Sequence, residues 1–178
     1  MTIEPNRRVL IAGIGNIFFG DDGFGVEVAV QLGRRSLPAG VRVVDFGIRG
    51  LHLAYDMLEH RYDEVIFVDA VQQQAPPGTV VLFEPTGDDL ADPAPDPHAM
   101  GPAVVLALLR SIGGTLPRVL VVGCEPDTLA PGIGLSPVVE AAVGPAVQAI
   151  IALMARSGLQ VAAVEPGSCV PELKTETS

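Results

Sequence analysis

Residues 8–25, RVLIAGIGNIFFGDDGFG, contain the signals that decide the fold. The first part, Arg8–Ile14, is a short apolar run that ends at Gly15, which is typical of a strand buried on both faces of a sheet. An acidic pair and several glycines then lead into residues 23–37, whose apolar residues recur at helical spacing until Pro38. The stretch therefore predicts a buried strand, a turn and an amphipathic helix.

The same alternation of strand and helix continues along the chain. Further strands are expected at residues 41–46, 64–71 and 118–122, and further helices at residues 51–59, 98–112 and 136–155. Pro145 lies inside the last helix and predicts a kink or a break there. Alternating strands and helices form a largely parallel sheet covered on both sides. The predicted fold class is therefore α/β, a three-layer sandwich around a five-stranded, mostly parallel twisted sheet.

A strand expected at residues 79–83 departs from the parallel order. Only residues 72–78, which include two prolines, separate it from the strand before, whereas a parallel crossover needs a dozen or more residues. We therefore expect this strand to run antiparallel, at an edge of the sheet.

Length and composition indicate one domain. The chain has 178 residues, of which 48% are apolar, enough for a sizeable core but too few for two ordinary domains. We assign residues 1–164 to this domain and residues 165–178, which have little apolar pattern, to a flexible tail. No uninterrupted apolar stretch reaches the roughly 18 residues of a membrane span. The two cysteines show neither disulfide nor zinc spacing, so we expect a cytoplasmic protein without a membrane anchor.

The charge balance excludes one class of partner. A net charge of −10 opposes the phosphate backbone of nucleic acids, and aromatic residues, at 4% of the chain, are too few for base stacking.

The sequence also shows no long exposed heptad pattern, so we expect a monomer.

The loop after the first strand also begins like a dinucleotide-binding loop. It opens Gly13-Ile14-Gly15, and Asp45 at the end of the second strand imitates the acid that holds a ribose. However, Phe18 stands where a third glycine is required for close packing of helix on strand, and the acidic pair would repel a pyrophosphate. A nucleotide-binding module of Rossmann type therefore remains the less favoured alternative.

Three of the expected elements carry side chains of the types that can bind a metal. Asp21 and Asp22 open the first helix, where helix capping is the ordinary role of an acid, and a second acid is left to face a cleft. Asp69 ends a central strand at the carboxyl edge, where ligands of α/β sheets gather, although solvated acids are also common there. His98 follows the acidic, proline-rich loop 85–97 and opens a helix, an ordinary place for a histidine as well.

Together these side chains predict an open metal site. If the strand order is 2-1-3, the loop of Asp22 and the end of the strand with Asp69 are neighbours, and the loop before His98 can reach them. Two carboxylates and an imidazole suit a borderline transition metal better than magnesium or calcium. The sequence has no GxSxG or HExxH motif, so the usual peptidase signatures are missing.

Several motifs, taken in order, resemble the hydrogenase maturation protease family, nickel-dependent endopeptidases that trim the large subunit of nickel–iron hydrogenases. The resemblance extends from about residue 8 to residue 158. The matching segments are Gly13–Asn16, Asp21–Gly25, Val68–Ala70, Asp96–His98, and Gly134–Pro137 followed by Val139 and Glu140.

The resemblance implies an activity and the residues that perform it. Asp22, Asp69 and His98 would be the metal-contacting and catalytic residues of an aspartic-type, nickel-dependent endopeptidase. The nickel would be supplied by the partner, a nickel–iron hydrogenase large-subunit precursor, which would then lose its C-terminal extension. The first of the three is often Glu in relatives, so Asp22 has a shorter reach with the same charge.

The resemblance also points to a segment after the second strand. The family carries an Asp-x-Gly-Thr-like sequence there, which reads Asp45-Phe46-Gly47-Ile48 in this chain. Asp45 and Gly47 are therefore candidates for substrate binding, and Asp45 is otherwise an acid in a turn at the strand end. Ile48 replaces the hydroxyl residue, which suggests a divergent substrate subgroup. A non-catalytic metal-sensing chaperone for the precursor is the alternative function from another class.

Overall fold

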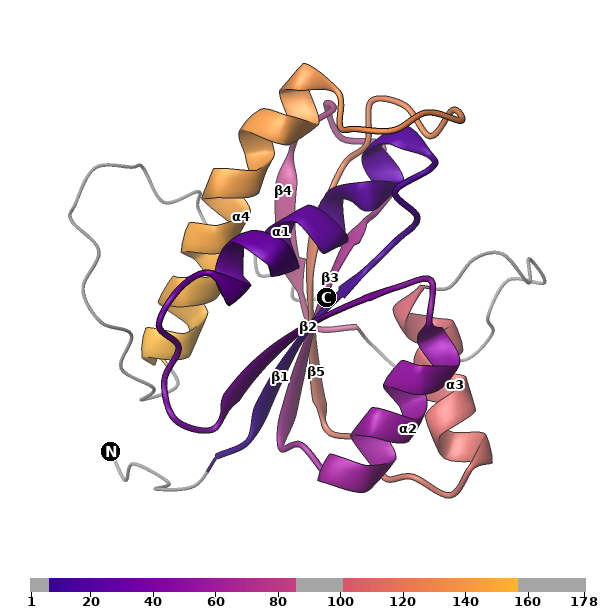
Figure 1. Cartoon of the computed structure of the whole chain (residues 1–178), viewed down its shortest axis with the longest axis vertical. Helices are drawn as coiled ribbons and strands as arrows, with labels where there is room; N and C mark the ends of the chain where they lie inside the picture. The colour runs from indigo at the N-terminus through magenta and orange to yellow at the C-terminus, as the bar shows by residue number, and fades with distance from the viewer. Residues whose placement is uncertain (1–6, 86–100, 157–178) are drawn as a thin grey trace.

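A computed structural model describes residues 7–85 and 101–156, which form one sheet with helices on both faces (Figure 1). The five strands lie in the order β2-β1-β3-β5-β4. Their bounds are Val9–Ile14 (β1), Val41–Gly47 (β2), Glu64–Ala70 (β3), Val80–Phe83 (β4) and Arg118–Cys124 (β5). The order 2-1-3, on which the predicted approach of two acidic segments depended, is therefore present.

The directions of the strands follow the lengths of their connections. β1 lies parallel to both β2 and β3, and β3 lies parallel to β5. β4, which follows β3 after a short connection, runs antiparallel to β5 at the end of the sheet. The predicted antiparallel edge strand is confirmed.

The helices cover the two faces of the sheet in pairs. α1 (Phe24–Gly33) and α4 (Pro137–Arg156) contact each other on one face, and α2 (Gly50–His60) and α3 (Pro102–Ser111) contact each other on the other (Figure 1). Alternate residues of each buried strand contribute to the two cores, because successive side chains point to opposite faces. The predicted three-layer α/β sandwich is confirmed.

The sequence predicted a kink or a break at Pro145, and helix α4 shows no break there. Both Pro145 and Ala141, whose carbonyl loses its partner four residues on, are exposed, so water can hydrogen-bond to that carbonyl. On the opposite side, Val143 and Val147 are buried and hold the helix against the core on either side of the proline. Tertiary packing therefore keeps the helix continuous.

Helix α4 is also long and apolar enough, by length and composition, to cross a membrane. However, it contacts α1, β4 and β5 and contributes buried residues to one of the two cores. These contacts make it a core helix of the sandwich.

Glycines allow the amino end of α1 to approach the strands. A Cβ atom at Gly25 would lie 2.0 Å from the carbonyl oxygen of Val68 in β3, and one at Gly13 would lie 2.3 Å from the carbonyl oxygen of Gly25. Gly15 has a φ of +129°, and a Cβ there would lie 1.8 Å from the carbonyl oxygen of Asp22. The close-packing glycine that the dinucleotide pattern would place at Phe18 is thus supplied by Gly25.

Some predictions concern residues outside the described ranges. These are His98, most of the loop 85–97, and the tail 165–178 with its boundary at residue 164.

Candidate functional site

The fold brings two of the predicted site residues to one edge of the sheet. Asp22 lies in a short 3₁₀ helix, η1 (Gly20–Gly23), between β1 and α1, and Asp69 lies at the end of β3. Because β1 and β3 are parallel neighbours, their carboxyl ends meet at the same edge. This arrangement places Asp69 within the electrostatic influence of Asp22.

Asp69 is a buried carboxyl group whose surroundings oppose its negative charge. Asp69 is 8% exposed, and burial, followed by the negative charge of Asp22, raises the pKa of its carboxyl group well above the ordinary value. The backbone N–H of Ala70 acts in the opposite direction but does not outweigh these effects. A cation bound between the two carboxylates would remove the repulsion and favour the ionised form of Asp69.

Asp22 is held by a neighbouring backbone group. Its Oδ2 atom accepts a hydrogen bond of 2.6 Å from the backbone N–H of Asn16. Gly15, which packs against the carbonyl of Asp22, is the adjoining part of the same turn. The turn therefore fixes the carboxylate of Asp22 near the end of β1.

A complete three-ligand set is not contained in the described residues. Within residues 7–85 and 101–156, no group of three His, Cys, Asp or Glu side chains is placed to hold a metal ion. The predicted third member, His98, lies outside these ranges. The chain re-enters the described part beside Asp69, since a Cβ atom at Gly101 would lie 4.0 Å from Oδ2 of Asp69.

Asp21 has a role that the sequence did not reveal. It is completely buried, and its carboxylate accepts hydrogen bonds from residues 106 to 115 positions away in the loop between β5 and α4. The donors are the backbone N–H groups of Asp127 and Thr128, each at 2.9 Å, and both the backbone N–H and the hydroxyl of Ser136, at 2.6 and 2.9 Å. Asp21 therefore clamps a distant loop to η1 and does not cap a helix.

The donors around Asp21 keep it ionised. Burial acts to raise its pKa, but the combined hydrogen bonds from Thr128, Ser136 and Asp127 outweigh burial and lower the pKa below the ordinary value. A motif signal existed, because Ser136 belongs to the Gly134–Pro137 segment of the family resemblance. The sequence did not show that the two motifs bind each other.

Asp45 and Gly47 lie at the carboxyl end of β2, next to β1. Gly13 pairs with Asp45 and Ile14 pairs with Gly47, so the register shifts between them. The Oδ1 atom of Asp45 is buried and has no hydrogen-bond partner among the described residues. Gly47 has a φ of +54°, and its carbonyl accepts a hydrogen bond from the backbone N–H of Gly15. This segment is therefore joined to the turn that carries Asp22.

Two other groups near this edge have structural roles. The Oε2 atom of Glu125 accepts hydrogen bonds from the backbone N–H groups of Gln73, at 2.6 Å, and Ala75, at 3.3 Å, and so holds the connection between β3 and β4. Burial, followed by the charges of Asp21 and Glu125, raises the pKa of the Cys124 thiol to about 12. A protonated, buried thiol is a poor nucleophile, so Cys124 is not suited to catalysis.

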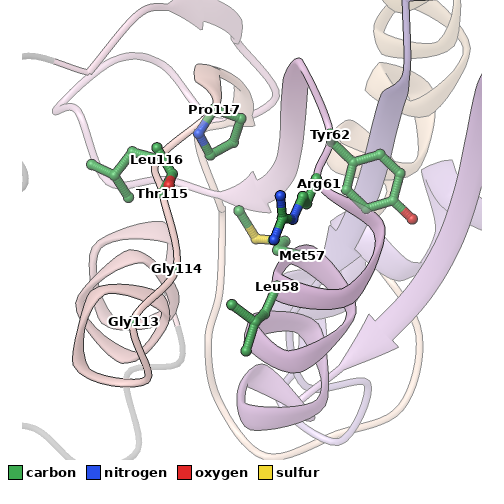
Figure 2. A pocket seen from close by; sticks show the side chains of 9 residues that line it. All are labelled: Met57, Leu58, Arg61, Tyr62, Gly113, Gly114, Thr115, Leu116 and Pro117. Atoms are coloured by element: carbon green, nitrogen blue, oxygen red, sulfur yellow. The ribbon is translucent and has the colours of Figure 1, made fainter.

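A hollow of about 230 Å³ lies elsewhere, between the end of α2 and the loop before β5 (Figure 2). Its walls are Met57, Leu58, Arg61, Tyr62 and residues 113–117. Tyr62 precedes β3 and residues 113–117 precede β5, so the hollow lies at the amino edge of the sheet, opposite Asp22 and Asp69. Without a carboxylate or an imidazole in its walls, it offers no comparable chemistry.

Exposed apolar side chains gather on two loops beside the carboxylates. We call residues 16–20, after β1, and 127–136, after β5, the paired loops, because Phe19 and Gly132 form a parallel β-bridge. The exposed apolar residues of the paired loops are Ile17, Phe18, Phe19, Leu129 and Ile133. The sequence signal was the run Ile17–Phe19, three consecutive apolar residues placed in a loop.

The chain matches one family of known proteins. A family model described as hydrogenase maturation protease matches residues 26–153. The chain is 35% identical over 156 residues to the hydrogenase 2 maturation protease of Escherichia coli (strain K12), a match that covers 86% of this chain and 94% of that protein.

The solved structures that are similar to this chain include hydrogenase maturation peptidases. The hydrogenase maturating endopeptidase HybD from E. coli is similar with a TM-score of 0.74 and 34% identity, over 86% of this chain and 95% of that chain. A hydrogenase 2 maturation peptidase from a Thaumarchaeota archaeon gives a TM-score of 0.62 and 36% identity, over 83% of this chain and 98% of that chain. The residues matched by the family model, 26–153, include Asp69 and begin four positions after Asp22.

Proposed function

Because this chain belongs to the hydrogenase maturation protease family, we propose that it removes the C-terminal extension of a nickel–iron hydrogenase large-subunit precursor after nickel insertion. The observation that carries the proposal is the pair of carboxylates at the edge of the sheet. Asp69 is buried beside Asp22, and a bound cation is what this pair lacks for charge balance.

The third nickel contact in this proposal is His98. The support is the position of Gly101, three residues further along the chain, which lies beside Oδ2 of Asp69. A segment of this length can bring an imidazole to the carboxylates. Two carboxylates and one imidazole are an acceptable donor set for a divalent transition metal such as nickel.

The nickel is supplied by the substrate in this proposal. A precursor without nickel presents no cation to Asp22 and Asp69, so binding would leave the two carboxylates repelling each other in a closed interface. A precursor with nickel would neutralise them and gain coordination bonds. The charge of the site therefore makes binding conditional on the metal.

Cleavage of the peptide bond requires an activated water molecule. A carboxylate of the pair would act as the general base, or the metal would polarise the scissile carbonyl. The aspartic-type assignment corresponds to the first route, with Asp22, Asp69 and His98 as the catalytic residues. Replacing each carboxylate by its amide separates metal contact from proton transfer, because an amide oxygen can still bind a metal but the amide is not a base.

Asp45 and Gly47 are the proposed substrate-binding residues. The buried Oδ1 atom of Asp45 has no hydrogen-bond partner within residues 7–85 and 101–156, so a donor from the precursor would satisfy it. Ile48, which is 59% exposed, stands beside them where the family pattern has a hydroxyl residue. The apolar side chain favours a client with an apolar group at this position.

We place this activity in the cytoplasm and assign it to a monomer. Cys124 is a free, buried cysteine, which is compatible with a reducing compartment.

The deciding experiment is the intact mass of a nickel–iron hydrogenase large-subunit precursor after incubation with this protein, with and without prior nickel loading. We expect loss of a C-terminal peptide from the nickel-loaded precursor only. An Asp69→Asn variant should abolish this loss, whereas Glu59→Gln, which changes an exposed carboxylate on α2, should not.

A stable complex with a precursor of unchanged mass would instead support the metal-sensing chaperone. Thermal stabilisation by a dinucleotide, with no effect of the precursor, would favour the nucleotide-binding module.

A further inference from the structure

The paired loops expose apolar surface that the fold does not use. Phe18 is 60% exposed and Ile133 is 80% exposed, and Ile17, Phe19 and Leu129 are exposed beside them on the same two loops. We call these five side chains the apolar platform. Large apolar side chains that gather at one place on a protein surface mark an interaction site more often than singly scattered ones do.

The platform has a rigid base, which distinguishes it from a mobile loop that happens to expose apolar residues. The backbone N–H of Gly20 donates to the carbonyl of Gly132, and the backbone N–H of Gly132 donates to the carbonyl of Phe18, both at 2.9 Å. The backbone N–H of Asp21 donates to the carbonyl of Thr128 at 3.0 Å. The buried carboxylate of Asp21 adds its own bonds to the second loop.

The platform is continuous with the candidate site. Ile17 and Phe18 follow Asn16 directly, and the backbone N–H of Asn16 donates to the carboxylate of Asp22. A polypeptide that places a metal at Asp22 and Asp69 would therefore come close to residues 16–20. Since the second loop is bonded to this segment, Leu129 and Ile133 extend the same surface.

The charge of the platform indicates the chemistry of its partner. The paired loops contain one charged side chain, that of Asp127 at the start of the second loop, and residues 16–20 and 128–136 contain none, although the whole chain has a net charge of −10. A basic partner segment would find no counter-charge on the platform itself, whereas an apolar segment would lose no solvation of charged groups there. The surface therefore fits an uncharged, apolar stretch of polypeptide.

We propose that the apolar platform binds an apolar segment of the precursor polypeptide next to the metal, and so sets substrate affinity independently of nickel contact. This inference rests on the proposed function. Phe18 and Ile133 are the main contacts, because they expose the largest fractions and have the most surface to bury. The Asp21 clamp is the positioning element that keeps the two loops in register.

The test compares the rate of precursor shortening against precursor concentration for the wild-type protein and a Phe18→Ser/Ile133→Ser double variant. We expect KM to rise at least tenfold and kcat to stay within about twofold, because the lost contacts bind the ground state and the transition state of the precursor equally. The matched control is Tyr55→Ser, which removes an exposed aromatic group from the middle of α2 and should leave both parameters unchanged. An unchanged KM in the double variant would overturn the proposal.

The experiment also separates this proposal from the proposed function. If the wild-type protein leaves the precursor uncut, endopeptidase activity fails, and the dissociation constant of the uncut complex becomes the test. Tenfold weaker binding by the double variant would then support the platform, and equal binding, or none by either protein, would overturn it. A wild-type dimer in analytical ultracentrifugation that the double substitution dissociates would also overturn it, because a second copy would then occupy the surface.

Discussion

Asp21 and Asp69 are both buried carboxyl groups at the same edge of the sheet, but their surroundings act on them in opposite directions. Asp21 is surrounded by donors from a single distant loop, and its pKa is lowered despite burial. Burial and the charge of Asp22 raise the pKa of Asp69, and among the described residues only the backbone N–H of Ala70 acts to lower it. The part of the protein that the structure describes thus stabilises the charge of Asp21 with hydrogen bonds and gives Asp69 no comparable set of donors.

This difference separates a structural acid from a functional one. A carboxylate whose two oxygens both accept hydrogen bonds from buried protein donors is part of the fold, and its removal damages the fold. A carboxylate held in a cleft without such donors reduces stability in the free protein and gains most from a bound cation. The comparison predicts that stability and activity respond separately to substitutions at the two positions.

The largest expected effect is the loss of processing in Asp69→Asn. The amide cannot act as a base, and its neutral oxygen binds nickel less strongly than a carboxylate does, so the rate of precursor shortening should fall roughly 1,000-fold. The thermal midpoint should not decrease, because a neutral amide removes the repulsion with Asp22. Single-turnover mass spectrometry and circular dichroism measure the two quantities, and a destabilised but active variant would reverse the assignment.

Asp21→Asn should show the opposite response, with a loss of stability of about 2–4 kcal/mol. In either orientation of the amide, its NH₂ group faces at least one backbone N–H group that now donates a hydrogen bond to the carboxylate, and that hydrogen bond is lost. The free energy of unfolding in urea is the measurement. A wild-type value for this variant would mean that the clamp between η1 and the second paired loop is not a significant part of the fold.

A smaller effect is expected from Ser136→Ala, which removes one donor and leaves the other bonds to Asp21 intact. The expected loss is about 1 kcal/mol in urea unfolding. Ser111→Ala is the matched control, because the Ser111 hydroxyl also donates a hydrogen bond, to the carbonyl of Leu108, but at an exposed position. Equal losses of unfolding free energy in the two variants would indicate that burial does not strengthen the hydrogen bond between Ser136 and Asp21.

The smallest effects are on the pH dependence of stability, and they have opposite signs. For Asp21 the folded pKa is below the ordinary value of about 3.9, so its contribution is complete above that value and is lost as the pH falls through the folded pKa. For Asp69 the folded pKa is raised, so its charge destabilises the protein above that pKa, and the cost is relieved as the pH falls toward about 3.9.

Urea unfolding of the metal-free protein between pH 3 and 8, with a chelator present, checks these signs. Asp69→Asn should remove a gain in stability on mild acidification, and Asp21→Asn should remove a loss below pH 4, each of the order of 1 kcal/mol. If both variants altered the same pH range in the same direction, the contrast between the two carboxylates would be wrong.

Much of the fold was predictable because its signals are local. The apolar runs at β1 and β3 identify buried strands, and the short connection after β3 excludes a parallel crossover, which fixed β4 as an antiparallel edge strand. Pro145 shows the limit of this reasoning. The missing N–H predicts a kink or a break, but the exposed position of the proline and burial on both sides of it keep α4 unbroken.

The site was predictable in part for the same reason. The sequence by itself determined which acids follow which strands, and the handedness and order of parallel strands then required Asp22 and Asp69 to meet at one edge. It also determined the family, because the motifs occur in order over most of the chain.

Only the tertiary structure decided what each acid does. Asp21 and Asp22 are adjacent in the sequence and equally suited to capping. However, Asp21 accepts hydrogen bonds from donors more than a hundred residues away, whereas the charge of Asp22 acts on Asp69. The exposure of Phe18 and Ile133 was likewise set by the pairing of two loops. The physical reason is that hydrogen bonding, burial and charge interaction depend on neighbours in space, and these neighbours exist only once the chain has folded.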